Sequence, residues 1–512
     1  MKHMMVFMGI VGALAACNGS DDSTTTAQTA QSATPQAEAG TPADAAESVR
    51  KTIEALRRGG GATGGAGAPP PSLPPSSAKD PGPRPVVSGP GRAAGEKIAS
   101  LTPAQSAAYD AGLKEFTEAD DVEEGLGPTM NLDSCGGCHS HPAIGGSSPP
   151  KNPQIAFAAA GADKVPSFLT ETGPIREVRF VRNPDGSPDG GVHGLFTITG
   201  REGADGCNLS QPDFAAEQAR NNVVFRIPTP LFGAGLIESI PDREILQNQG
   251  RSAQAKQALG IRGRPNVLLT SSSISGQPNK NGNDGTIGRF GHKAQNKSLL
   301  IFSGEAYNVE MGITNGAFPT ERDETEGCLF APSPNTDYDL DAKLSADVIS
   351  AIDRFTLFMR FLAAPTPVTT TFTTASATVS DASIAAGRKS FDDLGCALCH
   401  TPSLRTYAST KVPALGGAQA VNLFSDLLLH DMGRGLADGV QQGQAGGREW
   451  RSAPLWGLGQ RLFFLHDGRT SDLRQAIGEH ASDGSEANGV TRRFFALPDA
   501  QQQDLLNFLR SL

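Results

Sequence analysis

Two short motifs in this sequence combine two cysteines and a histidine at one spacing. They are Cys135, Cys138 and His139 in the first half of the chain and Cys396, Cys399 and His400 in the second. The two thiols of such a motif can each bond one vinyl group of a haem, and the histidine on the same turn can ligate the iron. A redox or zinc CxxC pair with an accidental histidine is the weaker interpretation. The sequence therefore predicts two covalently bound haem c groups, with His139 and His400 as iron ligands.

The second axial ligand of each iron would decide between electron transfer and catalysis. A haem closed by histidine or methionine on its second face transfers electrons, whereas an open face can bind peroxide or O2. The candidates for the second haem are His430, Met432, His466 and His480. We expect His466 to be a structural histidine near the haem edge.

An internal repeat extends each motif. In each half the CxxCH motif is followed by Pro-Leu-Phe/Trp-Gly-x-Gly, at 230–235 and 454–459, and then by Phe-x-His, at 290–292 and 464–466. A leucine stands seven residues after each of these histidines, as Leu299 and Leu473. The repeat therefore indicates two haem domains of common origin, the first enlarged by insertions.

The segments between the motifs predict a mainly α-helical fold. Helical patterns run from Thr102 to Asp120 and from Ala346 to Leu362, whereas alternating segments at 177–182 and 192–199 predict a β-hairpin. We expect a first cytochrome c-like domain at 97–365, with β-hairpin and loop insertions. A second cytochrome c-like domain should occupy 366–512.

The N-terminal region is typical of an export signal followed by a tether. A basic start, an apolar run and small residues before Cys17 predict a lipoprotein signal peptide at 1–16, with Cys17 lipidated. The apolar run falls short of the roughly 20 residues that span a bilayer. Residues 17–96, rich in Ala, Gly, Pro and Ser, are expected to form a disordered tether.

This leader predicts a location in the cell envelope. The protein would face the periplasm and contact the membrane through its lipid anchor only. Asn18 stands where an aspartate often marks retention in the inner membrane, which favours the outer membrane.

Two cysteines, Cys207 and Cys328, remain outside these assignments. An oxidising compartment favours a disulfide between them over two free buried thiols. The chain has 44 basic and 54 acidic residues, a net charge of -10, and no basic block longer than two residues. This balance argues against nucleic acid as a partner.

Four segments of the second half resemble the di-haem oxidoreductase family of peroxidase-like proteins. The family is often labelled thiol oxidoreductase and is related to bacterial di-haem cytochrome c peroxidases and to MauG. The segments are 396–400, 427–433, 451–457 and 465–469. The resemblance covers about residues 101–512. It implies reduction of hydrogen peroxide at haem 1, on the first CxxCH motif, with electrons entering through haem 2, on the second.

The resemblance also implies roles for individual residues. In the electron-transfer half of these relatives, the helix after Phe-x-His carries the sixth ligand, and His480 stands at that place, with His430 and Met432 as alternatives. In the peroxidatic half a Glu-Met pair follows, here Glu310 and Met311, and the glutamate works in the distal pocket. A pocket carboxylate can take a proton from peroxide and return it to the leaving oxygen. The other interpretation is a surface glutamate beside a core methionine.

The first half departs from the relatives at one position. They often carry a tryptophan next to the Phe-x-His phenylalanine, where it can bridge the haems, whereas this chain has Gly291 and His292. Phe290 or His292 could substitute, or electrons could take another path. His292 could instead close haem 1, which would argue against peroxidase activity.

Two alternatives to a peroxidase stay open at this point. One is an electron-transfer cytochrome with both irons six-coordinate, and the other is a di-haem oxygenase that uses O2. For the peroxidase, the expected electron donor is a small protein such as a cytochrome c or a cupredoxin. Whether a calcium ion binds between the domains is left open.

Overall fold

A computed structural model of the protein describes residues 72–87, 93–268, 286–331, 350–408 and 412–512, with two short strands at 273–274 and 277–278. The expected signal peptide, Cys17 and most of the expected tether lie outside these residues. None of the helices in these ranges is both long and apolar enough to cross a membrane.

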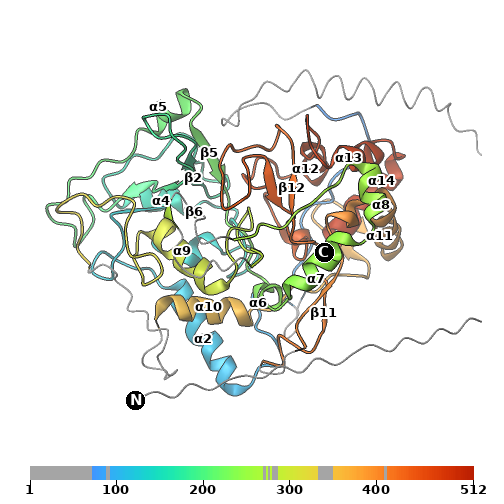
Figure 1. The fold of residues 1–512 in the computed structure, drawn as a ribbon, viewed down its shortest axis with the longest axis horizontal. Coiled ribbons are helices and arrows are strands. Elements are labelled where there is room, and N and C mark those ends of the chain that lie inside the picture. The colour runs from blue at the N-terminus through green and yellow to red at the C-terminus, as the bar shows by residue number, and fades with distance from the viewer. Residues whose placement is uncertain are drawn as a thin grey trace, which may run out of the picture. The chain divides into compact units, whose positions relative to one another are not determined.

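Helices dominate the described part of the chain (Figure 1). The α-helices are α2 (Pro103–Thr117), α3 (Cys135–Cys138), α4 (Gln154–Ala159), α5 (Phe214–Ala219), α6 (Ala234–Glu238), α7 (Asp242–Gly250), α8 (Ala253–Leu259), α9 (Leu299–Met311), α10 (Ala351–Phe361), α11 (Asp381–Leu394), α12 (Leu473–Glu479), α13 (Asn488–Phe495) and α14 (Asp499–Ser511). Two 3-10 helices are η1 (Cys396–Leu398) and η2 (Leu458–Gln460). The expected mainly α-helical class is confirmed, whereas the arrangement as two cytochrome c-like domains stays a prediction.

The strands are two to four residues long. They are β1 (Thr129–Met130), β2 (Glu177–Phe180), β3 (Val192–His193), β4 (Phe196–Thr197), β5 (Val223–Arg226), β6 (Ser273–Ile274), β7 (Gln277–Pro278), β8 (Phe372–Thr373), β9 (Thr378–Val379), β10 (Leu404–Arg405), β11 (Ala420–Val421), β12 (Leu429–Asp431) and β13 (Glu449–Arg451). The described strands form antiparallel pairs, except for one three-stranded sheet in the order β3-β2-β5.

The expected hairpin is present, but its second strand is shorter than predicted. β2 pairs with β3, whereas β4 turns away and pairs with β1. The break falls at Gly194, where a Cβ atom would lie 2.6 Å from Cβ of Thr129. The other edge of β2 pairs with β5 and sets Glu177 opposite Arg226.

Each half of the chain contains one helix pair that crosses at a glycine. In the first half (97–365) α2 packs against α10, and in the second (366–512) α11 packs against α14 (Figure 1). A Cβ atom on Gly112 of α2 would lie 2.4 Å from the carbonyl oxygen of Arg354, and one on Gly387 of α11 would lie 1.9 Å from that of Asp504. Glycine therefore allows the two backbones of each pair to approach closely.

The two helices that flank the first half match their expected positions closely. Thr102 caps α2 through a reciprocal capping box with Gln105, and the helix ends where Glu118 adopts an extended backbone. The helix expected from Ala346 to Leu362 appears as α10, and residues 346–349 lie outside the described residues.

The apolar core falls into two large clusters. The larger is built around α2, α9, α10 and the β2 sheet, and Phe358 at its centre is fully buried. The second gathers α11, α13 and α14 around Phe391 and Leu506. Leu404 and Leu427 lie beyond the expected boundary at 365 but pack into the larger cluster. The halves therefore share part of their core.

The end of the expected tether is corrected by the structure. Residues 72–87, which we call the strap, pack on the second half. Both oxygens of Asp80 pair with the buried guanidinium of Arg510, at 2.7 Å each, and one also accepts from the Leu473 backbone N–H at 2.9 Å. Residues 93–96 are also ordered against the first half, since Tyr109 donates to the Gly95 carbonyl at 2.8 Å. The composition of residues 72–87 and 93–96 predicted disorder. It could not show the groups that stabilise these residues, because those groups lie elsewhere in the chain.

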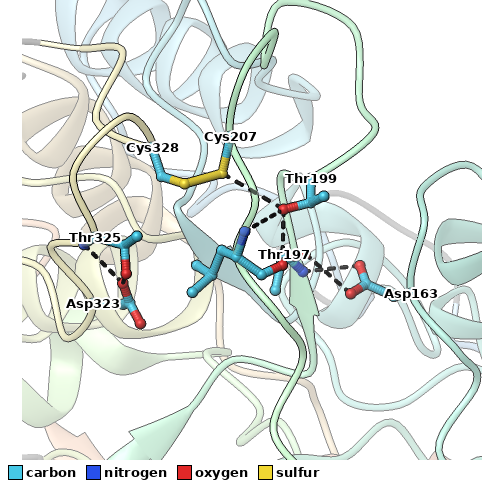
Figure 2. Close-up of a disulfide and its surroundings, with 8 residues drawn as sticks. Asp163, Thr197, Thr199, Cys207, Asp323, Thr325 and Cys328 are labelled. Carbon is cyan, nitrogen blue, oxygen red and sulfur yellow. Dashed lines mark hydrogen bonds between the residues drawn. A yellow bond between two sulfur atoms is a disulfide. The ribbon is translucent and has the colours of Figure 1, made fainter.

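Cys207 and Cys328 form a disulfide across 121 residues (Figure 2). The hydroxyl of Thr199 lies 3.5 Å from the sulfur of Cys207, and the neighbouring Thr197 donates to Asp163 at 3.1 Å. Closing so long a loop removes conformational freedom from the unfolded chain. The bridge fixes the loop that follows α9 to the loop that follows β4.

Candidate haem sites

A cavity of about 300 Å³ surrounds the second CxxCH motif. It is lined by Cys396, Cys399 and His400 and is largely apolar. The first half contributes Phe290 and His292 to the same wall. A concave, mostly apolar site with a few polar groups suits a large planar cofactor.

The four cysteines of the two motifs suit haem attachment because none of them is in a disulfide. His400 donates from Nδ1 to the carbonyl of Phe424 at 3.2 Å, and this bond leaves Nε2 available as a ligand. Burial lowers the pKa of His400 to about 4, so the imidazole is neutral near pH 7, as iron ligation requires.

His480 is the residue that the sequence predicts as the second axial ligand of haem 2. It follows the last residue of α12 and donates from Nδ1 to the carbonyl of Ala476 at 2.7 Å, which again leaves Nε2 free. It lines the same cavity as His400, and its proximity contributes to the lowered pKa of His400, after the larger effect of burial. The geometry therefore supports His480, whose role as a ligand stays a prediction.

His430, an alternative from the sequence, has both ring nitrogens engaged. Nε2 lies 3.1 Å from Asp426 and Nδ1 lies 3.0 Å from Glu486. Burial alone would lower its pKa, but Cys399 and Asp426 raise it well above the usual value. A charged imidazole held between two carboxylates has no lone pair for iron. Met432 also lines the cavity and is the remaining alternative.

Trp450 connects the two Phe-x-His motifs. His466 stacks on its indole with ring centroids 3.8 Å apart, and His292 meets it edge-on at 6.2 Å. Nε2 of His292 donates to the carbonyl of Ile227 at 3.0 Å. His292 therefore belongs to the wall of the haem 2 cavity, and this geometry does not support closure of haem 1 by His292.

The sequence analysis predicted no role for Trp450. A signal was present, because it is one of only two tryptophans in the chain and directly precedes the Arg451 to Gly457 segment of the family resemblance.

The first CxxCH motif is held in a similar way. His139 donates from Nδ1 to the carbonyl of Gly146 at 3.0 Å, and burial lowers its pKa to about 4. Phe116 of α2 meets the ring edge-on at 6.1 Å. The sulfur of Met311, at the end of α9, lies 3.9 Å from the sulfur of Cys135.

Glu310 lies close to this motif. Asn131 donates from its side-chain amide to Oε2 of Glu310 at 2.7 Å. The pKa of Glu310 is raised well above its usual value, first by burial and then by the negative charge of Glu177. Burial is the main cause of the raised pKa of Cys138, and the charge of Glu310 is the next contribution, which places the Glu310 carboxyl near the motif. Its role as a catalytic residue stays a prediction.

The described residues hold no group of three or more His, Cys, Asp or Glu side chains arranged to bind a metal ion.

The protein is mainly α-helical and has two CxxCH motifs, each of which is predicted to attach a haem. Residues 202–512 match the family model described as "Di-haem oxidoreductase, putative peroxidase". This is well over half of the chain, and the protein belongs to this family. The matched region contains the second CxxCH motif and begins after the first.

No curated protein matches the chain. Among solved structures, hydrazine synthase of Kuenenia stuttgartiensis, pressurised with xenon, is similar at 17% identity over 32% of this chain, with a TM-score of 0.20. The match spans 55% of the hydrazine synthase chain, and so distant a likeness has no bearing on function.

Proposed function

We propose that this protein is an exported, lipid-anchored c-type oxidoreductase that reduces hydrogen peroxide at haem 1. Electrons would enter through haem 2. The family supports an oxidoreductase with two haems. The assignment of the two roles rests on the difference between the two sites.

The residues that would hold the two haems are those of the CxxCH motifs. Cys135, Cys138 and His139 would hold haem 1, and Cys396, Cys399 and His400 would hold haem 2. A haem held in this way supplies one-electron redox chemistry at its iron.

The observation that carries the proposal is the identity of the residue seven positions after the first residue of each helix that follows Phe-x-His. Counting from Leu473, the first residue of α12, this position is His480; counting from Leu299, the first residue of α9, it is Ala306. A methyl group cannot ligate iron. The first half therefore has no counterpart of the ligand that His480 would provide in the second half, and it has Glu310 one turn further on.

Glu310 would handle protons in the first site. Reduction of hydrogen peroxide to two water molecules needs two electrons and two protons, and the breaking O–O bond needs a proton on the leaving oxygen. A carboxyl that takes a proton from peroxide and returns it to the leaving oxygen lowers this barrier. Asn131 orients that carboxyl through its 2.7 Å hydrogen bond.

Trp450 offers a path between the halves. The tryptophan that relatives carry next to Phe290 is absent here. Trp450 lies between His466 of one half and His292 of the other, and all three line the haem 2 cavity. We assign the bridging role to this stacked group.

The net charge and the N-terminal leader suggest an electron donor and a location. The net charge of -10 suits an electron donor with a positive docking patch, such as a cytochrome c or a cupredoxin. The lipid on Cys17 would hold the protein in the outer membrane, facing the periplasm.

Optical spectra of the full-length protein with both haems test the proposal. We expect one haem with an open coordination position, which changes on addition of hydrogen peroxide, and one closed haem that does not. Two closed haems that are indifferent to peroxide would overturn it. Oxygenation of an organic substrate by O2, without added peroxide, would support the oxygenase instead.

An electron-transfer cytochrome is a second candidate because of Met311. This methionine is buried, and its sulfur lies 3.9 Å from Cys135, so it is a candidate to close haem 1. Met311→Leu separates the cases. If Met311 is a ligand, the substitution opens haem 1 and changes its spectrum; if haem 1 is already open, the spectrum stays as it is.

A further inference from the structure

Two arginines line the haem 2 cavity without a carboxylate partner. Arg451, the last residue of β13, and Arg461, which follows η2, both border the cavity. Neither forms an ion pair with a described residue, whereas Arg289, a third arginine of the same wall, pairs with Asp242. The lining is otherwise largely apolar, so these two cations are the groups that an anionic ligand could neutralise.

The hydrogen-bonding capacity of both side chains is only partly used. Arg451 donates from Nε to the carbonyl of Gly291 at 3.0 Å and from Nη1 to that of Ser452 at 3.1 Å, and its Nη2 has no partner among the described residues. Nε of Arg461 is buried and also has no hydrogen-bond partner there. A buried donor without a partner destabilises a protein, so a ligand that accepts from these nitrogens would compensate that cost.

The carboxylate that lines the cavity is already engaged elsewhere. Among the described lining residues only Glu486 carries one, and its Oε2 lies 3.0 Å from Nδ1 of His430 and accepts from the backbone N–H of Arg262 at 2.9 Å. Burial lowers the pKa of Arg451 and of Arg461 to about 10, so both side chains stay charged near pH 7. The cavity wall therefore contains two cations that no described carboxylate balances at ion-pair distance.

The internal repeat shows that both cations belong to the second half alone. Arg451 stands three residues before Pro454, and Arg461 stands seven residues after it. At the same distances from the proline of the first-half motif, the chain has Ile227 and Ile237. An isoleucine cannot bind an anion, so the first half has no counterpart of either group.

The backbone on which each arginine stands is fixed by contacts from other segments. The backbone N–H of Arg451 donates to the carbonyl of His292 at 3.0 Å. The carbonyl of Arg461 accepts from Nη1 of Arg510 at 2.9 Å, and Arg510 is the partner of Asp80 in the strap. The strap therefore helps to fix the position of Arg461 in the cavity wall.

We propose that Arg451 and Arg461 bind the two propionate carboxylates of haem 2. Haem c has two propionates, which two guanidinium groups match in number and in charge, and the planar fork of arginine suits a carboxylate. This inference rests on the presence of haem 2 in this cavity, which the proposed function includes, and not on the reduction of peroxide. A positive charge beside a haem favours its reduced state, so the two arginines would also assist electron entry at haem 2.

A structure of the full-length protein with both haems tests the contact directly. We expect an oxygen of each haem 2 propionate to lie within about 2.7–3.2 Å of a guanidinium nitrogen of Arg451 or Arg461. Propionates that reach neither arginine would overturn the inference. A small anion, such as chloride, bound between the two arginines in place of the propionates would overturn it as well.

Spectroelectrochemical titration of haem 2 tests the charge of the same site. Arg461→Gln removes a cation and leaves a propionate without its partner, so the equilibrium constant for reduction should fall about tenfold, which is ~59 mV for one electron. Arg461→Lys keeps the charge and should restore most of this loss. Arg492→Gln, at an exposed position of α13, is the control and should leave the potential unchanged.

Arg451→Gln gives a second measurement, which decides the question if Arg461→Gln fails to fold or to attach haem. It should lower the equilibrium constant for reduction of haem 2 in the same direction. Haem 1 should keep its potential in all of these variants, because its half has isoleucine at both positions. An unchanged haem 2 potential in the folded glutamine variants would overturn the inference.

The reaction of haem 1 with peroxide is measured separately in the same samples. If haem 1 reacts while the potential of haem 2 is independent of both arginines, the inference fails and the proposed function stands. If haem 2 responds as expected while haem 1 is inert to peroxide, the proposed function fails and the arginine site stands.

Discussion

The two halves of the molecule build the same framework and then differ in one helix. Both cross two helices at a glycine, hold the CxxCH histidine through Nδ1 on a backbone carbonyl, and place a glycine of positive φ, Gly233 or Gly457, at the start of a short helix. The helix after Phe-x-His has 13 residues in the first half and seven in the second.

This difference in length has a local cause. α12 ends at Glu479, and the hydroxyl of Ser485 donates to the carbonyl of His480 at 2.6 Å, which fixes the chain as it leaves the helix. α9 continues to Met311, where Gly312 ends it in the left-handed conformation. One framework can therefore present a histidine in one half and a carboxyl in the other. In the proposed assignment of roles, the difference in helix length accompanies the replacement of His480 by Ala306 at the matching position.

The largest expected effect comes from removing the carboxyl that only the first half has. Glu310→Gln should lower the rate of reaction with peroxide by about 10²- to 10⁴-fold, the usual contribution of general acid-base catalysis. Stopped-flow spectroscopy of haem 1 measures it, with Glu202→Gln as the control. An unchanged rate would remove Glu310 from the mechanism.

The disulfide is a second feature of the first half. Replacing Cys207 and Cys328 together by serine should lower the free energy of unfolding by about 2–5 kcal/mol, because the unfolded chain regains the freedom of a long loop. Denaturant titration followed by circular dichroism measures this loss. Equal stability of the variant and the parent protein would show that the bridge contributes nothing to folding.

Removal of His480 tests the comparison through the second half. His480→Ala should open haem 2 and reduce donor-dependent turnover by roughly 10- to 100-fold, in line with the loss of support at other metal sites. The spectrum of haem 2 should change and that of haem 1 should not. If haem 2 keeps two axial ligands, Met432 and not His480 closes it.

The smallest effects are expected at the glycine helix crossings that the two halves share. Gly112→Ala and Gly387→Ala should each destabilise the fold by about 1–3 kcal/mol, the usual cost of overpacking. The loss should be larger for Gly387, where the added atom would lie 1.9 Å from a carbonyl oxygen, against 2.4 Å for Gly112. Thermal unfolding of both variants gives the comparison. Tolerance of alanine at one crossing would show that the two helix pairs differ.

Structural features that depend on residues close together in the chain could be predicted from the sequence. Capping at Thr102 set the start of α2, and alternation predicted the contact of β2 with β3. The second strand was predicted too long, because the close contact of Gly194 with β1 comes from a segment more than 60 residues away. Local periodicity contains no information about such a contact.

The prediction of covalent haem attachment needs no tertiary structure, because it depends on two thiols and a histidine within five consecutive residues. The sequence also limited the disulfide to the two cysteines left over. The tertiary structure decided which histidine is free. The family resemblance favoured His480 and left His430 as an alternative, and the structure shows that Asp426 and Glu486 engage both nitrogens of His430. The packing of the strap and the contacts of Trp450 could not be predicted for the same reason. A carboxyl or an indole acquires its role from the groups that surround it, and folding brings those groups from distant parts of the chain.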